Sequence, residues 1–224
     1  MAIDREFLKS IPYFTGITDE ELDAVERIVM EKTVERGGII IHEGDPAGSL
    51  FIVYSGAVKI FKTSTEGKEQ IFRIARPGDT FNDTPIFESG INPTSALAMG
   101  PVVLYEIKKN DVETLLKTYL NIVQNTIRVL SKRVSQMGTL IEDLSFRRVI
   151  GRVARILLEH ADNDASENEP RLTQQDMAAM AGTAREVVGR SLKTLEDEGI
   201  IKLNRSRIII ADKEALRERI ESPD

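Results

Sequence analysis

A stripe of apolar residues with a strict heptad spacing constrains this sequence more than any other feature. Its members follow one another at alternating intervals of four and three residues: Val123, Ile127, Leu130, Val134, Met137, Ile141 and Leu144. These are the a and d positions of a coiled coil. At 1.5 Å per residue, this heptad stripe spans roughly 33 Å of helix. We therefore expect a long helix that pairs with a second copy of the chain in a parallel homodimer.

An amphipathic helix that lies on its own domain is the alternative explanation of the heptad stripe. Such a helix usually has an apolar face wider than the a and d positions alone, so the narrow stripe favours the dimer. Arg128, Lys132 and Arg133 flank the stripe, and we expect all three side chains to be solvated.

The region from residue 33 to about residue 107 has a different pattern. Short β-branched and aromatic runs such as SLFIVYS and AVKIFKT alternate with glycines, among them Gly56 and Gly78. Short strands separated by turn residues are typical of an antiparallel sandwich or roll. A parallel α/β fold is not expected, since no helical crossovers separate the runs. Before this region, Thr18 and Glu21 form a capping-box pattern that predicts the start of a helix.

The sequence contains no cysteine and carries a net charge of −6 at pH 7. The lack of cysteine excludes disulfides, iron–sulfur clusters ligated by cysteine and zinc sites with cysteine ligands. His42, in the segment IIIHEGD, lacks the second histidine of a metalloprotease motif. There is no nucleophile elbow, Walker loop or dinucleotide-binding fingerprint either. We therefore assign no catalytic or metal-binding residues and do not expect an enzyme.

Hydropathy and net charge bound the possible partners. No apolar run is long enough to cross a bilayer, and the N-terminal MAIDREFLKS has no apolar signal core. We therefore expect a cytoplasmic protein without a membrane partner. The acidic net charge argues against non-specific coating of nucleic acid, but it permits a local basic patch.

Residues 172–201 have the pattern of a helix-turn-helix. Thr173 and Asp176 can cap a first short helix that ends near Met180 or Ala181. Gly182 falls at the turn, where a left-handed backbone is often needed. A second helix is expected over residues 184–198, with Gly199 as its C-cap. Its buried face is expected to consist of Val188, Leu192 and Leu195.

Three charged residues lie near the N-terminal, opposite face of that second helix. They are Arg185, Glu186 and Arg190. A recognition helix contacts base edges with this face; arginine can donate twice to guanine, and glutamate can accept from cytosine N4. A surface ion pair between Glu186 and Arg190 is the alternative. It explains neither Arg185 nor the neighbouring turn, cap and hairpin, so we favour DNA recognition.

The segment IIKLNRSRIIIAD, residues 200–212, predicts two strands around a polar turn. We expect this hairpin to act as a wing that directs Lys202, Arg205 and Arg207 towards DNA phosphates. A hairpin whose charges serve only solubility is the alternative. Its position directly after a helix-turn-helix favours the wing.

Several motifs together give the chain an end-to-end resemblance to the Crp/Fnr superfamily of bacterial transcription regulators. They are EGDPAGSLFIVYSGAVKIFK, the heptad stripe and GTAREVVGR. The resemblance implies an α+β fold: a cyclic-nucleotide-binding-like β-roll over residues 1–118, a dimerisation helix over 119–145 and a winged helix-turn-helix domain over 146–224. It also implies RNA polymerase as a partner. The acidic stretch 162–169 could contact the polymerase or stay solvated, and we favour solvation.

The resemblance further implies a homodimer that binds double-stranded DNA. The GTAREVVGR segment is very similar to the catabolite activator branch, so Arg185, Glu186 and Arg190 are expected to recognise a TGTGA-like half-site of a palindrome. Ala184 and Val187 replace two serine or threonine positions that contact phosphate in close relatives. We therefore expect phosphate contacts from the wing and from Thr173, Gln174 and Gln175.

The effector pocket is where the sequence departs from cyclic-nucleotide-binding members. In those members a Gly-Glu pair holds the ribose and an Arg-Ser pair holds the cyclic phosphate. Asp83 with Thr84, and Thr94 with Ser95, occupy these positions here. On the dimer helix, Met137 is followed by Gly138 where the activator branch has polar contacts to the base. We assign the effector pocket to Asp83, Thr84, Thr94, Ser95 and Met137.

No cofactor is predicted for this pocket. We do not expect cAMP to bind tightly, because no arginine neutralises its phosphate and Asp83 would repel it. The loop offers neither Cys nor His for haem. An anionic metabolite would need a basic lining, for which Arg73 is the nearby candidate. A small neutral or hydrophobic ligand, or none, fits the loop best.

The sequence therefore predicts a dimeric, sequence-specific DNA-binding regulator that is either controlled by an unknown effector or independent of one. In this hypothesis a signal at residues 83–95 and Met137 re-aims the DNA-binding domains about a hinge near Ser145 and Phe146. A ligand-binding or protein-interaction module that no longer binds DNA is the alternative. Loss of the three charged helix residues would favour that alternative, but they are present.

Overall fold

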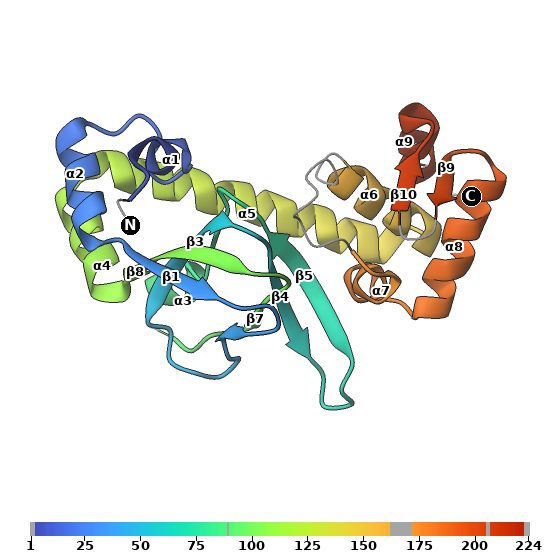
Figure 1. The fold of residues 1–224 in the computed structure, drawn as a ribbon, viewed down its shortest axis with the longest axis horizontal. Helices are drawn as coiled ribbons and strands as arrows, with labels where there is room; N and C mark the ends of the chain where they lie inside the picture. Colours follow the sequence, from blue (N-terminus) through green and yellow to red (C-terminus); the bar gives the residue numbers. More distant parts are fainter. Residues whose placement is uncertain (1–2, 89, 162–171, 205–206, 222–224) are drawn as a thin grey trace. The chain divides into compact units, whose positions relative to one another are not determined.

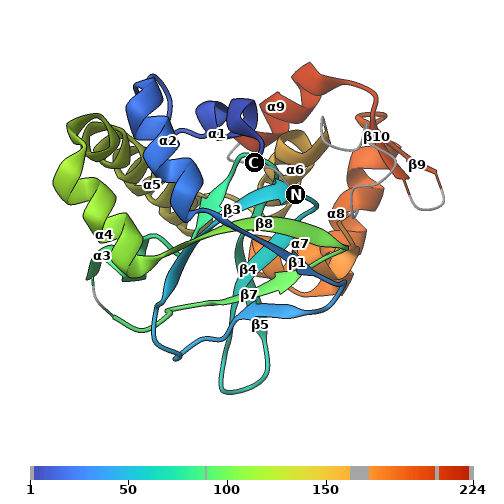
Figure 2. The same ribbon diagram turned by 60° about the vertical axis from the view of Figure 1, so that its left-hand side comes forward.

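The computed structural model describes residues 3–88, 90–161, 172–204 and 207–221. The chain divides into two compact units. The first comprises residues 1–62 and 72–135, and the second comprises residues 63–71 and 136–224. Figures 1 and 2 show the elements of both units from two directions.

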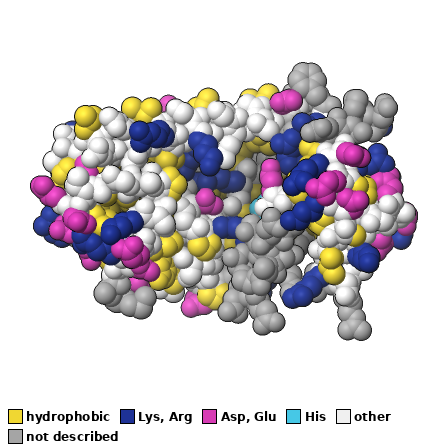
Figure 3. Space-filling view, turned by 90° about the horizontal axis from the view of Figure 1, so that it is seen from above, with side chains coloured by type: hydrophobic (Ala, Val, Ile, Leu, Met, Phe, Trp, Pro, Cys, Tyr) yellow, Lys and Arg dark blue, Asp and Glu magenta, His cyan; other side chains and the backbone are white. Residues whose placement is uncertain are grey.

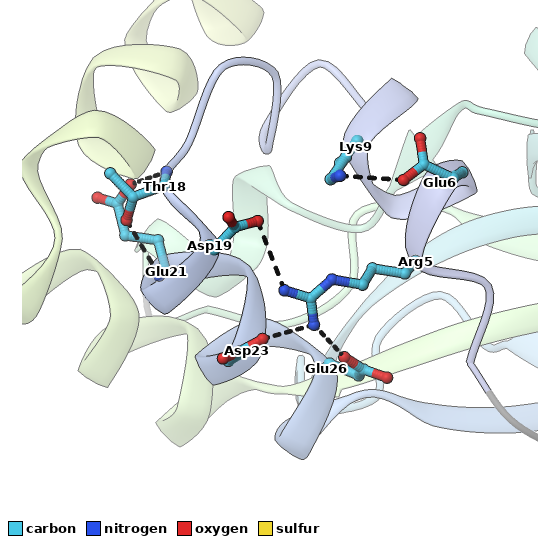
Figure 4. A network of polar contacts seen from close by, with 8 residues as sticks. All are labelled: Arg5, Glu6, Lys9, Thr18, Asp19, Glu21, Asp23 and Glu26. Atoms are coloured by element: carbon cyan, nitrogen blue, oxygen red, sulfur yellow. Dashed lines mark hydrogen bonds and ion pairs between the residues drawn. The ribbon is translucent and has the colours of Figure 1, made fainter.

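Two short helices begin the first unit, α1 (Arg5–Ser10) and α2 (Asp19–Ile28). The capping box predicted for α2 is confirmed, since Thr18 Oγ1 accepts from the Glu21 amide and the Glu21 carboxylate accepts from the Thr18 amide at 2.7 Å. Arg5 reaches from α1 to Asp23 and Glu26 of α2, at 2.5 and 2.8 Å (Figure 4). These ion pairs are partly solvated, so they orient α1 more than they stabilise it.

The β-roll consists of two four-stranded sheets. The first has the order β1 (Met30–Val34), β8 (Val102–Lys108), β3 (Ser49–Ser55) and β6 (Thr80–Phe81). The second has the order β2 (Ile39–Ile41), β7 (Ser95–Ala98), β4 (Val58–Thr63) and β5 (Glu69–Ala75). The pairs β1–β8, β3–β8, β3–β6, β2–β7 and β4–β7 are antiparallel, as the short punctuated runs predicted.

Strand β3 of the first sheet is buried on both faces. On β3, Phe51 and Val53 enter the core between the two sheets. Leu50 and Ile52 enter a second core, which the helices of this unit cover. Because successive strand residues point to opposite faces, a strand buried on both sides is apolar throughout. This explains the unbroken LFIV run in β3.

Three further helices complete the first unit: α3 (Thr84–Glu88), α4 (Lys109–Thr118) and the N-terminal part of α5 (Leu120–Phe146). Helix α5 has 27 residues and is therefore about 40 Å long. Ile122, Asn125 and Thr126 bury one of its faces against the unit, and the Asn125 amide donates to the Tyr13 and Thr15 carbonyls at 3.1 and 2.9 Å.

The second unit contains the helix-turn-helix. Its elements are the remainder of α5, α6 (Val149–Ala161), α7 (Gln174–Ala181), α8 (Arg185–Asp197), β9 (Ile201–Asn204), β10 (Arg207–Ile210) and α9 (Lys213–Glu221). The break between α5 and α6 lies at residues 147–148, two residues beyond the expected hinge. Helix ends are not fixed that closely by a sequence pattern.

A close helix contact shapes the core of this second unit. Gly151 of α6 faces α9 so closely that an added Cβ would lie 3.2 Å from the Arg219 carbonyl oxygen. The apolar core beside it contains Val153, Leu192 and Leu216 from α6, α8 and α9. In the described part of the chain, no helix has the length and apolarity needed to span a membrane.

Gly56, in the turn between β3 and β4, should not tolerate a side chain. Its φ is 85°, and an added Cβ would clash with the Pro101 carbonyl and lie 3.1 Å from Val102 Cα. We expect Gly56→Ala to lower the free energy of unfolding by roughly 3 kcal/mol or more, which urea denaturation can measure. Gly67→Ala is the control, because Gly67 has a φ of 79° but no atom near that Cβ. Its cost should be about 1–2 kcal/mol, and equal costs would contradict the clash.

Candidate functional site

The turn between α7 and α8 has the predicted geometry. Thr173 caps α7 through a capping box with Asp176. Gly182 ends α7 in the left-handed conformation, with φ 63° and ψ 40°, and its amide donates to the Ala178 carbonyl. Ala178 is almost fully buried where the two helices meet. A residue with a Cβ would be strained at Gly182, so this glycine is required by the turn itself.

Helix α8 divides into a buried and an exposed face. Val188, Leu192 and Leu195 are buried, as predicted. Arg185, Glu186 and Arg190 are exposed. Within the described residues, none of these three side chains makes a hydrogen bond or an ion pair with another side chain. The surface pair between Glu186 and Arg190 is therefore not formed, and three charged groups on one helix end remain available to a ligand.

The candidate phosphate contacts lie around this helix end. Gln174 and Gln175 are exposed on the first turn of α7, whereas the Thr173 hydroxyl is occupied by its cap, donating to Asp176 Oδ2 at 2.7 Å. In the hairpin, Lys202 pairs with Ile209 and Asn204 with Arg207. Alternation along the strands therefore places Lys202 and Arg207 on the same, outer face of the wing. Arg205 lies outside the described residues.

Charges on the α9 side of this unit are mixed rather than basic. Figure 3, seen from above, shows Lys and Arg interspersed with Asp and Glu on the C-terminal part of the chain. Arg217 of α9 pairs with Glu214 at 2.7 Å, and Arg219 pairs with Glu198. In Figure 1, α9 lies at the top of this unit and α7 at the bottom. Arg185 and Arg190 of α8, by contrast, make no ion pair within the described residues.

A second polar site lies in the first unit around Asp83, which is 2% exposed. Its Oδ2 accepts from the Tyr13 hydroxyl at 2.6 Å, and its Oδ1 accepts from the Thr84 amide at 2.9 Å and from Arg133. Burial, and then the neighbouring Asp83 carboxylate, raise the pKa of Tyr13, so that its hydroxyl stays protonated. We call Tyr13, Arg73, Thr80, Asp83 and Arg133 the Asp83 cluster.

Arg133 corrects one prediction. It is not solvated: it ion-pairs with Asp83 and donates to the Thr80 carbonyl and hydroxyl at 2.8 and 2.7 Å. Arg133 follows Ile122 by 11 residues and Thr126 by 7, so all three lie on the same face of α5. This is the face that packs on the β-roll. No local pattern indicates this contact, because Asp83 lies 50 residues away from Arg133 in the sequence.

Arg73 of β5 also belongs to the cluster. Its Nη2 donates to the Thr80 carbonyl, the same oxygen that Arg133 contacts. Burial lowers the pKa of Arg73, and the positive charge of Arg133 lowers it further, whereas the nearby Asp79 and Asp83 carboxylates raise it. Arg73 makes no ion pair with any described carboxylate, so the cluster holds two guanidinium groups and one paired carboxylate.

The other predicted effector residues are not part of this cluster. Thr84 is exposed, Thr94 is partly buried and Met137 is 64% exposed. Ser95 Oγ accepts from the Glu43 amide at 3.1 Å. Asn82, directly before Asp83, has a φ of 63° and its side chain donates to the Ser49 carbonyl at 3.0 Å. Asn82 therefore adopts the left-handed backbone that is typical of glycine.

The heptad stripe lies mainly on the exposed face of α5. Ile127, Val134, Met137 and Ile141 are 58, 69, 64 and 65% exposed. Val123 and Leu130 are partly buried, and the side chain of Leu144 lies outside the described residues. Leu120, 69% exposed, continues the spacing three residues before Val123 and was missed by the sequence analysis. One face of α5 packs on its own unit, and the face that carries most of the stripe is exposed, so the predicted pairing with a second copy stays a prediction.

Arg133→Met should destabilise the first unit, because it leaves the buried Asp83 carboxylate without its cation. We expect a loss of about 3 kcal/mol in the free energy of unfolding, measured by urea denaturation. Lys132→Met is the control on the neighbouring, exposed position, with an expected change of about 0.5 kcal/mol or less. Adding Asp83→Asn to Arg133→Met should restore part of the loss. Equal stability of the Arg133 and Lys132 variants would contradict the ion pair.

Comparison with known proteins agrees with this arrangement. Residues 31–119 match the family described as cyclic nucleotide-binding domain, and residues 151–219 match the Crp-like helix-turn-helix domain. A CRP-like cAMP-activated global transcriptional regulator of Mycobacterium tuberculosis is 28% identical over 220 residues, covering 96% of this chain and 98% of the relative. A cyclic AMP receptor protein of Thermus thermophilus is 27% identical over 211 residues, covering 94% and 97%.

Solved structures share the fold. A CRP/FNR family regulator of Thermus thermophilus has a TM-score of 0.72 and 26% identity, covering 87% of this chain and all of that one. FixK2 of Bradyrhizobium japonicum has a TM-score of 0.76 at 22% identity, covering 85% and 96%. The β-roll, long helix and winged helix-turn-helix thus occur together in known regulators. The chain belongs to the Crp/Fnr family of DNA-binding transcription regulators, and it is not an enzyme.

Proposed function

We propose that the protein acts as a homodimer that recognises a TGTGA-like palindrome. The observation that carries this proposal is the exposed, unpaired group of Arg185, Glu186 and Arg190 at the N-terminal end of α8. Elsewhere in this unit Arg217 and Arg219 are held by acidic neighbours. Charged side chains that have no protein partner can form charge-assisted hydrogen bonds with a ligand, and these are stronger than hydrogen bonds between neutral groups.

Each of the three side chains has a defined role in this proposal. Arg185 and Arg190 donate to guanine O6 and N7 in the major groove, and Glu186 accepts from cytosine N4. Gln174, Gln175 and the outer face of the wing contact phosphates, with Lys202, Arg205 and Arg207 as the wing residues and Thr173 near the cap. Both the hydroxyl and the backbone amide of Thr173 donate to Asp176 Oδ2, at 2.7 and 3.0 Å. The exposed Gln174 and Gln175 are therefore the stronger phosphate candidates on this turn.

Arg185→Ala should weaken binding to the palindrome by about 1–3 kcal/mol and relax specificity at one base pair. The reason is that a bidentate contact to guanine is lost while phosphate contacts remain. Fluorescence anisotropy on a TGTGA–spacer–TCACA duplex, and on duplexes changed at single positions, measures both effects.

Arg217→Ala is the matched control for this experiment. It removes the same charge from α9, on the other side of the unit, and should leave the affinity nearly unchanged. Equal weakening of Arg185→Ala on every duplex would place Arg185 on a phosphate. Equally weak binding of the wild-type protein to cognate and mutated duplexes would contradict recognition of this half-site.

The dimer in this proposal forms through the heptad stripe. Large apolar side chains that are exposed in one copy, such as Val134 and Ile141, repeat at the a and d spacing, which suits a second identical helix. Leu120 lengthens the contact at its N-terminal end. A dimer brings two recognition helices to successive major grooves, one helical turn of DNA apart, which a palindrome requires.

Val134→Glu should dissociate the dimer, because pairing would bury two carboxylates against apolar side chains. We expect the dimer dissociation constant to rise by about 100-fold or more, measured by analytical ultracentrifugation. Lys132→Glu changes an exposed position beside the stripe and should leave the protein dimeric. A monomeric wild-type protein at micromolar concentration would rule out this interface.

Regulation by cAMP is not part of the proposal, although one relative is named a cAMP-activated regulator and another a cyclic AMP receptor protein. Three of the roughly four acceptor positions of the Asp83 carboxylate are already used, by Tyr13, Arg133 and Thr84, so little remains for a ribose hydroxyl. At Thr94, no charge is available for a cyclic phosphate. We infer that cAMP binds weakly and that a different effector, or none, acts on the protein.

RNA polymerase is the partner through which such a dimer would act on transcription. The acidic stretch 162–169, weighed as a contact to it, lies outside the described residues. Control would arise as a population shift, in which a signal in the β-roll changes how the two recognition helices are presented. A module that no longer binds DNA is disfavoured by the retained charges of α8.

A further inference from the structure

We propose that Arg152 of α6 is a positioning residue for DNA recognition. It joins the break between α5 and α6 to the turn from which α8 begins. This inference rests on the proposed function and deepens it, because it names a residue that sets the direction of α8 without contacting DNA itself. The residues that carry it all belong to the second unit.

The guanidinium group of Arg152 binds two backbone carbonyl groups that lie far apart in the sequence. Its Nε donates to the Ala181 carbonyl at 2.9 Å, and its Nη1 donates to the Arg147 carbonyl at 2.6 Å. Ala181 is the last residue of α7, and Arg147 lies in the break between α5 and α6. Because a guanidinium carries its donors in a rigid, planar fork, it holds the two carbonyl groups in a fixed relation to each other.

The same guanidinium group supplies a cation to the C-terminal end of α7. The last carbonyl groups of a helix carry the negative end of its dipole, and the last turn of α7 contains no basic residue of its own. The Gly182 and Thr183 amides both donate to the Ala178 carbonyl, whereas the Ala181 carbonyl accepts from Arg152. The end of α7 is therefore held in part from α6.

Helix α8 depends on this turn for its direction. Its N-cap is Ala184, which has no side-chain acceptor and makes no side-chain cap hydrogen bond. The N-terminal end of α8 is thus placed by the turn that precedes it and by the apolar core that its buried face joins. Arg185 and Glu186 are its first two residues, so a shift of the turn moves the side chains that the proposed function assigns to bases.

The other end of this link is anchored as well. Nη1 of Arg147 donates to the Ile220 carbonyl of α9. Gly151, beside Arg152, brings the backbone of α6 so close to α9 that a Cβ would lie 3.2 Å from the Arg219 carbonyl oxygen. A continuous chain of hydrogen bonds and packed groups can carry a movement from one element to another. A movement at the break between α5 and α6 would thereby reach α8.

Fluorescence anisotropy of the full chain tests this inference on two duplexes, TGTGA–spacer–TCACA and the same duplex with both half-sites mutated. The proteins are the wild type, Arg152→Met, Arg152→Lys and Arg217→Met. Methionine keeps much of the apolar stem but has no donor, whereas lysine keeps the charge and an ammonium donor. Arg217 pairs with Glu214 on α9, so its replacement removes one positive charge from a different helix.

We expect Arg152→Met to bind the TGTGA duplex about tenfold more weakly than the wild type. Its binding to the mutated duplex and its salt dependence should stay unchanged, because no phosphate contact is lost. Arg152→Lys should recover part of the affinity, since its ammonium can still donate to one of the two carbonyl groups. Arg217→Met should bind as the wild type does.

Four outcomes of the anisotropy experiment would overturn the inference. They are unchanged affinity of Arg152→Met, equal weakening on both duplexes, no recovery by Arg152→Lys, and a salt slope reduced by about one. The last outcome is the mark of a direct phosphate contact.

Hydrogen exchange measured by mass spectrometry without DNA separates this inference from the proposed function. In Arg152→Met, amides of residues 178–184 should exchange about tenfold faster than in the wild type, while the remainder of the second unit is unaffected. Unchanged exchange in this turn would overturn the inference, and so would faster exchange throughout the unit, which indicates loss of folding. A wild type that binds both duplexes equally would contradict the proposed half-site, and exchange of the turn would still decide the role of Arg152.

Discussion

Helix α5 packs on its own unit with one face and leaves the opposite face exposed, and the rest of the structure depends on this constraint. One face carries Ile122, Asn125 and Thr126 into the first unit, where amide hydrogen bonds and apolar packing hold it. The opposite face keeps Val134 and Ile141 exposed. A helix whose rotation is fixed by its own domain presents its second face in a fixed direction, which a coiled-coil contact needs.

Arginine has opposite roles in the two sites. In the Asp83 cluster, Arg133 is bound internally to a carboxylate and a backbone carbonyl, so its charge contributes to packing α5 on the roll. On α8, Arg185 and Arg190 have no partner among the residues that the structure describes, and they remain available. The difference lies in the environment. The buried Asp83 carboxylate fixes the guanidinium group of Arg133. On α8, the left-handed Gly182 turn and the apolar core hold the helix in place but do not bind the arginine side chains.

Features governed by local rules could be predicted from the sequence. The capping boxes at Thr18 and Thr173, the turn at Gly182 and the buried side of α8 depend on residues within a few positions of one another. The DNA-recognition candidates follow from the same helix periodicity. The solvation expected for Arg133 was wrong, because a cation beside a heptad stripe is usually solvated, and the sequence contains no sign of a carboxylate 50 residues away.

The sequence by itself determined the order of elements, the heptad spacing and the charged end of α8, since each is set by short-range periodicity and backbone preference. Only the tertiary structure decided which guanidinium groups meet. Arg73 and Arg133 converge on Thr80 because β5 and α5 pack on the same part of the roll, and Asp83 joins them through the turn at Asn82. Contacts of that kind depend on how distant segments pack, and packing is a property of the whole fold rather than of any segment.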